Sequence, residues 1–148
     1  DDINYEFPKN IRILKISKNK DLALIKIKSL RRKVDYFEIS KRIPKVGDEL
    51  HAIGHPEGEM WTYTKGYLNA YRFDYSAFEE ASSSLKEENF FYSGDVFQTQ
   101  IPIYPGNSGG PLLNNFGNII GINTFTNPDH PAMSFAITNR EIIKFLLN

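Results

Sequence analysis

A short run of small residues around Ser108 combines a side chain and a backbone suited to acyl-transfer chemistry. The run, residues 105–112, reads PGNSGGPL and is flanked by apolar segments. Glycine permits positive φ and close backbone approach, and consecutive N–H groups that point to one side can bind an anion. Such a loop can hold the negative oxygen of a tetrahedral intermediate while the serine hydroxyl attacks an acyl group. By itself, however, the run is more typical of a Gly-rich turn between two strands.

A nucleophilic serine also needs a base and a carboxylate. Its hydroxyl reacts poorly until an imidazole accepts the proton, and a carboxylate usually orients that imidazole. Asp21 is the candidate carboxylate because it lies at the mouth of an expected apolar hairpin, although it could equally be a turn aspartate that binds its own backbone. The three histidines, His51, His55 and His130, all follow Asp21, and we expect each to be a surface or structural residue.

A hairpin is expected to carry Asp21. Segments 11–17 and 21–28 are rich in β-forming residues and are separated by the polar turn 18–20. The apolar alternation slips between Ile13 and Leu14, which predicts a β-bulge there.

The remaining elements are expected to be short strands followed by one helix. Strands are predicted within segments 50–53, 60–73, 96–103, 111–113, 118–125 and 133–137, whereas the polar segment 74–94 is predicted to be a surface insertion. Thr138 and Glu141 have the spacing of a capping box, in which the threonine caps a helix and the glutamate bonds back. Many short strands with Gly/Pro turns predict a mainly β sandwich or barrel.

The composition narrows the range of functions. A chain of 148 residues can bury a substantial core. It contains no cysteine, which excludes disulfides, thiolate catalysis and cysteine-based zinc sites. No apolar run reaches the ~20 residues of a membrane-spanning helix.

Residues 1–45 hold 13 Lys and Arg against 6 Asp and Glu. We nevertheless expect no nucleic-acid partner, because this basic part lacks the interleaved aromatic residues of single-strand binders.

Seven segments follow one another in the order and approximate spacing of the trypsin-like serine proteases, most closely the HtrA/Deg branch. They are DLALIKI (21–27), VGD (46–48), AIGHPEG (52–58), QTQ (98–100), GNSGGPL (106–112), IGINT (120–124) and SFAI (134–137). The chain therefore resembles this family over nearly its whole length from Ile11 onward. Gln100 departs from the pattern, since the HtrA branch usually has aspartate there.

The resemblance implies a mainly β fold with two β-barrels and a C-terminal α-helix. Residues 1–45 would be the remnant of an incomplete first barrel, and residues 46–148 would form the complete second barrel. The resemblance implies that Ser108 is the nucleophile, that Asp21 is the triad aspartate and that the N–H groups of Gly106 and Ser108 form the oxyanion hole. The substrate side chain and backbone would meet Ile103, Asn123, Thr124 and Phe125.

One departure from the family pattern concerns the base. In this family the triad histidine precedes the aspartate, and no histidine precedes Asp21 here. The chain is then either a fragment of a longer protease or a non-catalytic pseudo-protease that binds peptides by strand addition. We favour the fragment, because a pseudo-enzyme would have little reason to keep the costly glycines of GNSGG, and we expect the isolated chain to be nearly inactive.

The resulting hypothesis is a serine endopeptidase that acts on polypeptides without metal or cofactor. A phosphate-binding loop is excluded because the Gly-rich run lacks the Gly-Lys-Ser/Thr sequence and the following helix. The resemblance is compatible with a homo-oligomer and, by analogy alone, with a periplasmic or secreted location.

Overall fold

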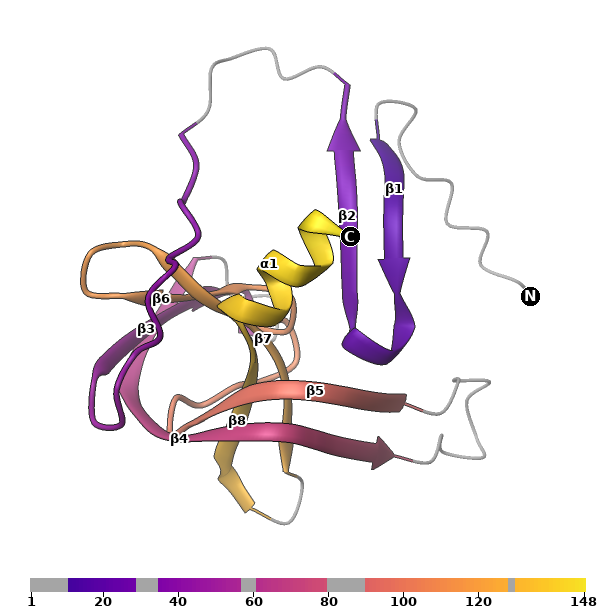
Figure 1. Ribbon diagram of the computed structural model, residues 1–148. Helices are drawn as coiled ribbons and strands as arrows, with labels where there is room; N and C mark the ends of the chain where they lie inside the picture. Colours follow the sequence, from indigo (N-terminus) through magenta and orange to yellow (C-terminus); the bar gives the residue numbers. More distant parts are fainter. Residues whose placement is uncertain (1–10, 29–34, 57–60, 80–89, 128–129) are drawn as a thin grey trace.

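The computed structural model describes residues 11–28, 35–56, 61–79, 90–127 and 130–148. Strands β1 (Ile11–Ser17) and β2 (Leu22–Ile27) form a separate two-stranded sheet, joined by the 3₁₀ turn η1 (Lys18–Lys20). The other strands form a closed barrel in the order β3-β4-β5-β8-β7-β6, followed by helix α1 (Asn139–Leu147) (Figure 1). These strands are β3 (Glu49–Gly54), β4 (Thr62–Glu79), β5 (Phe90–Thr99), β6 (Pro111–Asn114), β7 (Ile119–Asn127) and β8 (His130–Thr138).

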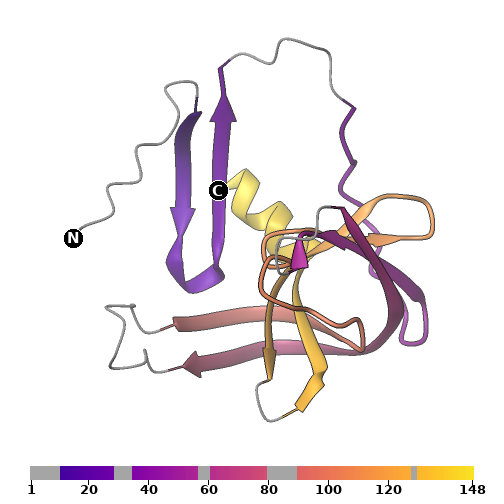
Figure 2. The same cartoon turned by 180° about the vertical axis from the view of Figure 1, so that it is seen from behind.

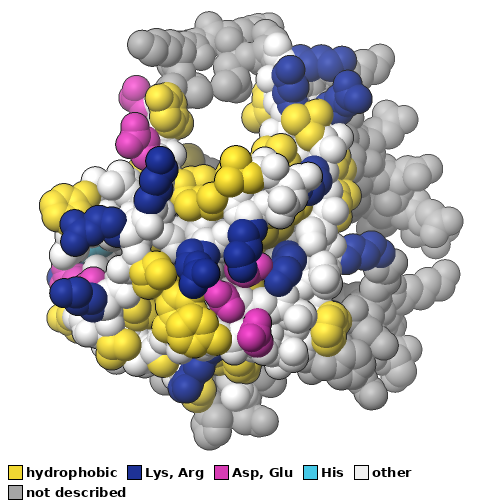
Figure 3. Space-filling model, viewed as in Figure 1, with side chains coloured by type: hydrophobic (Ala, Val, Ile, Leu, Met, Phe, Trp, Pro, Cys, Tyr) yellow, Lys and Arg dark blue, Asp and Glu magenta, His cyan; other side chains and the backbone are white. Residues whose placement is uncertain are grey.

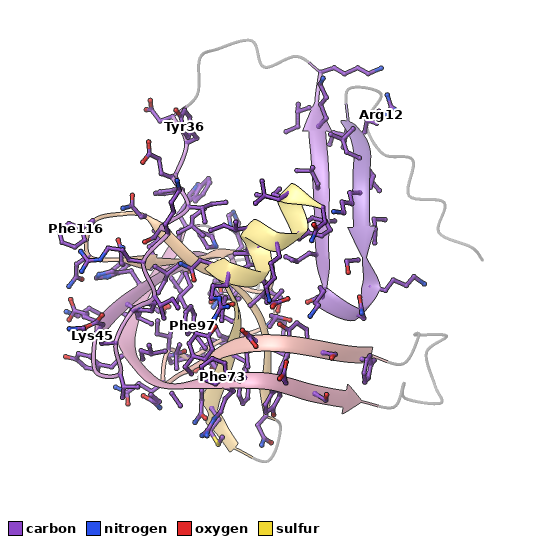
Figure 4. The ribbon with its side chains drawn as sticks, in the orientation of Figure 1. Arg12, Tyr36, Lys45, Phe73, Phe97 and Phe116 are labelled. Atoms are coloured by element: carbon purple, nitrogen blue, oxygen red, sulfur yellow. The ribbon has the colours of Figure 1, made fainter. Side chains whose placement is uncertain are left out.

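The barrel closes through antiparallel pairing of β3 with β6, in which Leu50 lies opposite Asn114. Alternate side chains point inward, as the burial pattern of β3 shows. Phe97 is fully buried within the barrel, whereas Phe116 at the turn between β6 and β7 lies at the periphery (Figure 4). The barrel core consists of Leu50, Ala52, Leu68, Phe97, Ile101, Ile103, Leu112, Ile120 and Ala136.

The hairpin of β1 and β2 packs against α1 and the barrel through its side chains. It stands beside α1 in both views (Figures 1 and 2), and none of the described barrel strands pairs with it. Its register shifts between Ile13 and Lys15, which confirms the predicted bulge. Leu22 is buried in a second core cluster, the hairpin cluster, together with Tyr92, Val96, Phe135, Ile137, Ile142 and Phe145.

Two sequence-based expectations are corrected. Segment 74–94 is not a simple surface insertion, because β4 continues to Glu79 and β5 begins at Phe90. Residues 80–89 are not among the described residues. The capping box forms only in part. Thr138 Oγ1 accepts the N–H of Glu141 at 3.3 Å, but the Glu141 carboxylate binds Lys20 and Lys144 instead of bonding back.

Charges of both signs lie close together on the surface. In Figure 3, Lys and Arg side chains lie next to Asp and Glu side chains over the middle of the face that Figure 1 shows. The described portion holds no helix with the length and apolar character needed to cross a bilayer. The boundary between the units 1–45 and 46–148 stays a prediction.

Candidate functional site

The loop that carries Ser108 joins β5 to β6 and is fixed by backbone hydrogen bonds. Within the loop, Asn107 N–H donates to Tyr104 O at 2.9 Å and Gly110 N–H donates to Asn107 O at 3.0 Å. Two further bonds attach it to β7: Gly109 N–H donates to Asn123 O at 2.8 Å, and Asn123 N–H donates to Gly110 O at 2.9 Å. The loop is therefore held at both Gly109 and Gly110 against the edge of β7.

Glycine is required at position 106. Gly106 has φ +102°, a conformation that other residues rarely adopt, and a Cβ atom there would overlap the carbonyl oxygen of His55. On the other side of the loop, a Cβ atom on Gly54 would overlap the buried Asn107 side chain. The loop thus packs closely on the chain segment 54–55, and this packing leaves no room for larger side chains.

Thr124 connects Ser108 to Asp21. The Ser108 hydroxyl donates to the backbone carbonyl of Thr124 at 2.8 Å. The Thr124 hydroxyl donates to Asp21 Oδ2 at 2.6 Å, across 103 positions of sequence. Asp21 itself has φ +49°, and its N–H donates to Lys18 O at 3.2 Å. The fold therefore brings the candidate serine and the candidate aspartate to two sides of one residue.

Two N–H groups of the loop donate to no acceptor among the described residues. Within the described ranges, neither the Gly106 N–H nor the Ser108 N–H donates a hydrogen bond, although those of Asn107, Gly109 and Gly110 all do. The role of the Gly106 and Ser108 N–H groups as an oxyanion hole stays a prediction.

The four residues expected to meet the substrate have different surroundings. Asn123 and Thr124 are buried on β7, and Ile103 belongs to the barrel core. The Phe125 ring instead packs against Phe135, with ring centroids 4.9 Å apart, on the side of the hairpin cluster. The structure thus unites Thr124 with Ser108 and Asp21, but it places Ile103 and Phe125 in separate clusters. Their contact with substrate stays a prediction.

The described histidines make other contacts. His51 hydrogen-bonds Tyr63 Oη at 2.7 Å and Asn115 Oδ1 at 2.5 Å. The His55 ring stacks edge-on against Trp61, and His55 lines a largely apolar cavity of about 520 Å³ beside Gly106. Neither ring hydrogen-bonds Ser108 or Asp21, and the side chain of His130 lies outside the described residues. The described part also shows no cluster of three or more potential metal-binding His, Asp or Glu side chains.

Sequence reasoning missed the part that four residues play in this region. It gave Thr124 only a role in substrate binding, and it gave Lys20 and Glu141 no role near the site. Tyr92, which is fully buried, lies close to these residues: burial and the negative charges of Glu141, Asp95 and Asp21 raise the pKa of its hydroxyl. No local pattern could have revealed this convergence, because it joins the hairpin, β5 and α1.

Comparison with known proteins agrees with this geometry. The model of the family described as "Trypsin-like peptidase domain" matches residues 6–122. The "Probable periplasmic serine endoprotease DegP-like" of Chlamydia pneumoniae is 42% identical over 104 residues, which are 70% of this chain and 19% of that protein. "Protease Do-like 1, chloroplastic" of Arabidopsis thaliana is 34% identical over 114 residues, which are 76% of this chain and 24% of that protein.

Solved structures are also similar. A serine endoprotease of Yersinia pestis superimposes with a TM-score of 0.67 at 28% identity, covering 93% of this chain and 43% of that one. The Rv3671c protease of M. tuberculosis in its active form gives a TM-score of 0.75 at 19% identity, with 93% and 57% of the chains covered, and supports the fold alone. The chain spans only about a fifth to a quarter of the length of the two curated relatives.

Proposed function

Because the chain belongs to the trypsin-like peptidase family, we propose that it carries the nucleophile and the orienting carboxylate of a serine endopeptidase. One observation carries the proposal. Ser108 and Asp21, which lie far apart in sequence, both hydrogen-bond Thr124: the Ser108 hydroxyl donates to Thr124 O at 2.8 Å, and the Thr124 hydroxyl donates to Asp21 Oδ2 at 2.6 Å. A Gly-rich turn with no catalytic role would not need this link to a carboxylate in the turn of a distant hairpin.

In the proposed reaction, Ser108 Oγ attacks the carbonyl carbon of a peptide bond. An imidazole accepts the hydroxyl proton and then donates it to the leaving amine, and Asp21 orients this imidazole and stabilises its charge. The N–H groups of Gly106 and Ser108 bind the oxygen that becomes negative. Water then hydrolyses the acyl-enzyme. We assign the imidazole to a histidine outside residues 1–148, because the family places the triad histidine before the aspartate and no histidine precedes Asp21. The described rings of His51 and His55 also bind other groups.

The proposed substrate is an extended polypeptide that lies along β7. The described ladder between β6 and β7 ends at Ile122, opposite Pro111, and β7 continues to Asn127 beyond that end. Strand addition at such a segment supplies main-chain hydrogen bonds that do not depend on substrate sequence. Ile103 and Asn123 would then lie near the substrate side chain.

A fluorophosphonate probe tests the proposal directly. The full-length product of the gene that encodes this chain is incubated with the probe and digested with trypsin, and the labelled peptide is identified by mass spectrometry. We expect the label on Ser108, because fluorophosphonates react with activated serine hydroxyls. A label confined to another residue, or no label at all, would contradict the proposed nucleophile.

A non-catalytic peptide-binding module is the second candidate, and one observation favours it. The Ser108 hydroxyl donates to a backbone carbonyl instead of an imidazole. A binding module would retain peptides without reacting with the probe. Binding of an unfolded protein such as casein, with no labelling and no cleavage, would support this candidate over the endopeptidase.

Gly106→Ala is expected to reduce the turnover of the endopeptidase by ~10²–10³-fold, the usual effect of losing one oxyanion donor. The added methyl group meets the carbonyl oxygen of His55, so the peptide at residue 106 must rotate away. Turnover is measured as the initial rate of fluorescent casein cleavage. Gly47→Ala is the control, because Gly47 has φ +91° with open space around it and lies in the turn before β3. Equal rates for both variants would contradict the assignment.

A further inference from the structure

We infer that Lys20 and Glu141 are positioning residues that hold Asp21 beside Thr124 by fastening the tip of the hairpin to helix α1. The inference rests on the proposed function for its catalytic consequence, whereas the fastening itself is a property of the fold. Neither side chain reaches Ser108 or a reacting atom. Their effect on the reaction would pass through the location of the Asp21 carboxylate.

Among the described residues, the hairpin that carries Asp21 is attached to the rest of the chain by side-chain contacts. The hairpin of β1 and β2 is a two-stranded sheet that forms no ladder with any described barrel strand. A two-stranded hairpin alone is marginally stable in water. Its outer part leaves Ile25 and Ile27 about half exposed, at 49% and 47%. Among the described residues, side chains join the hairpin to the rest of the chain, and several of them lie near the turn.

One of these contacts is the ion pair between Lys20 and the buried Glu141. Lys20 Nζ lies 2.9 Å from Glu141 Oε2, and Glu141 is only 5% exposed. The other carboxylate oxygen, Oε1, accepts from Lys144 Nζ at 2.8 Å. Burial acts to raise the pKa of Glu141, but the hydrogen bonds from Lys144 and Lys20 outweigh it and hold the pKa below its ordinary value. A buried carboxylate of this kind is costly to leave without its partners.

The turn links the Lys20–Glu141 ion pair to the backbone of Asp21. Lys20 directly precedes Asp21, and the bond from Asp21 N–H to Lys18 O closes the turn between them. A Cβ atom on Gly94 would lie 2.7 Å from Lys20 Nζ, so the ammonium group rests on the backbone of β5. The next residue, Leu22, is buried in the hairpin cluster. Asp21 therefore lies between Lys20, which is paired with Glu141, and Leu22, which is buried.

A second contact, which lies away from the tip, also attaches the hairpin to α1. Lys15 Nζ donates to Phe145 O at 2.5 Å and lies 4.5 Å from the centre of the Phe145 ring. This contact joins β1 to the end of α1. Loss of the Lys20–Glu141 pair is therefore expected to loosen the turn without releasing the whole hairpin.

The fastening is tested on the 148-residue chain, which has no native cysteine to interfere with labelling. Spin labels are placed through Asn19→Cys on η1 and Arg140→Cys on α1, both exposed positions, and the distance distribution between them is measured by electron paramagnetic resonance. We expect a narrow distribution that broadens in Glu141→Gln and in Lys20→Met but stays narrow in Lys20→Arg. Lys65→Met is the matched control, because it removes an exposed ion pair with Glu49 on the barrel. An unchanged distribution in Glu141→Gln would overturn the inference.

The catalytic consequence is tested in the full-length gene product. Glu141→Gln should slow labelling of Ser108 by a saturating fluorophosphonate by about tenfold or more, with an unchanged half-saturating concentration, because misplacement of a catalytic group affects the chemical step. Lys20→Met should act equally, the double variant should be no slower than either single one, and Lys20→Arg should restore the rate. Unchanged labelling of Ser108 in Glu141→Gln would overturn the positioning role alone. No labelling in any form, with a broadened distance distribution, would instead overturn the endopeptidase and leave the fastening in place.

Discussion

Ser108→Ala should lower the rate of casein cleavage by about 10⁶-fold, the scale observed when the nucleophile of a serine protease is removed. The methyl group cannot form the acyl-enzyme, so only the slow direct attack of water on a bound substrate remains. The rate is measured in the full-length gene product with fluorescently labelled casein under single-turnover conditions. The fluorophosphonate label should disappear from the same variant.

The fold should survive this substitution, because Ser108 is exposed and its hydroxyl makes one hydrogen bond within the described residues, to Thr124 O. Ser76→Ala, at an exposed position of β4, is the matched control and should cleave casein at the unaltered rate. Cleavage that persists in Ser108→Ala would show that another group is the nucleophile, and the proposed mechanism would then be wrong.

Asp21→Asn should reduce kcat by about 10⁴-fold, as loss of the orienting carboxylate does in a serine-protease triad. An amide can still accept the hydrogen bond of the Thr124 hydroxyl through its oxygen, so the hairpin is expected to stay docked. The amide introduced at position 21 cannot stabilise an imidazolium cation, however, and this amide favours the wrong tautomer of the imidazole. The measurement is the pH dependence of casein cleavage, with folding monitored by circular dichroism.

Asp48→Asn provides the comparison for Asp21→Asn. Asp48 is an ordinary turn aspartate, whose Oδ2 accepts the N–H of Lys45 at 2.8 Å before β3 begins. This change should leave kcat unaltered. If the two variants lose activity equally, Asp21 is itself no more than a turn residue, which is the alternative that its sequence position leaves open.

Local features of the fold could be read from the sequence because they depend on neighbouring residues. The slip in apolar alternation after Ile13 appears as the register shift before Lys15, since one extra residue moves every later side chain to the other face. The extent of β4 and β5 could not be read in this way. Segment 74–79 looks polar, but Tyr75 and Ala77 pack against the hairpin cluster and Tyr92 is buried in it, a burial that exists only once the barrel has closed.

By itself, the sequence determined the chemistry that the chain could carry. It placed Ser108 in a Gly-rich loop and Asp21 at the turn of a hairpin, because glycine at positive φ and turn-forming polar residues are local requirements. Only the tertiary structure decided that Thr124 joins the two. It also decided that Glu141 binds Lys20 rather than completing its helix cap. A carboxylate can satisfy its charge with a nearby N–H or with a distant ammonium group, and the choice depends on which elements the closed barrel and the docked hairpin bring together.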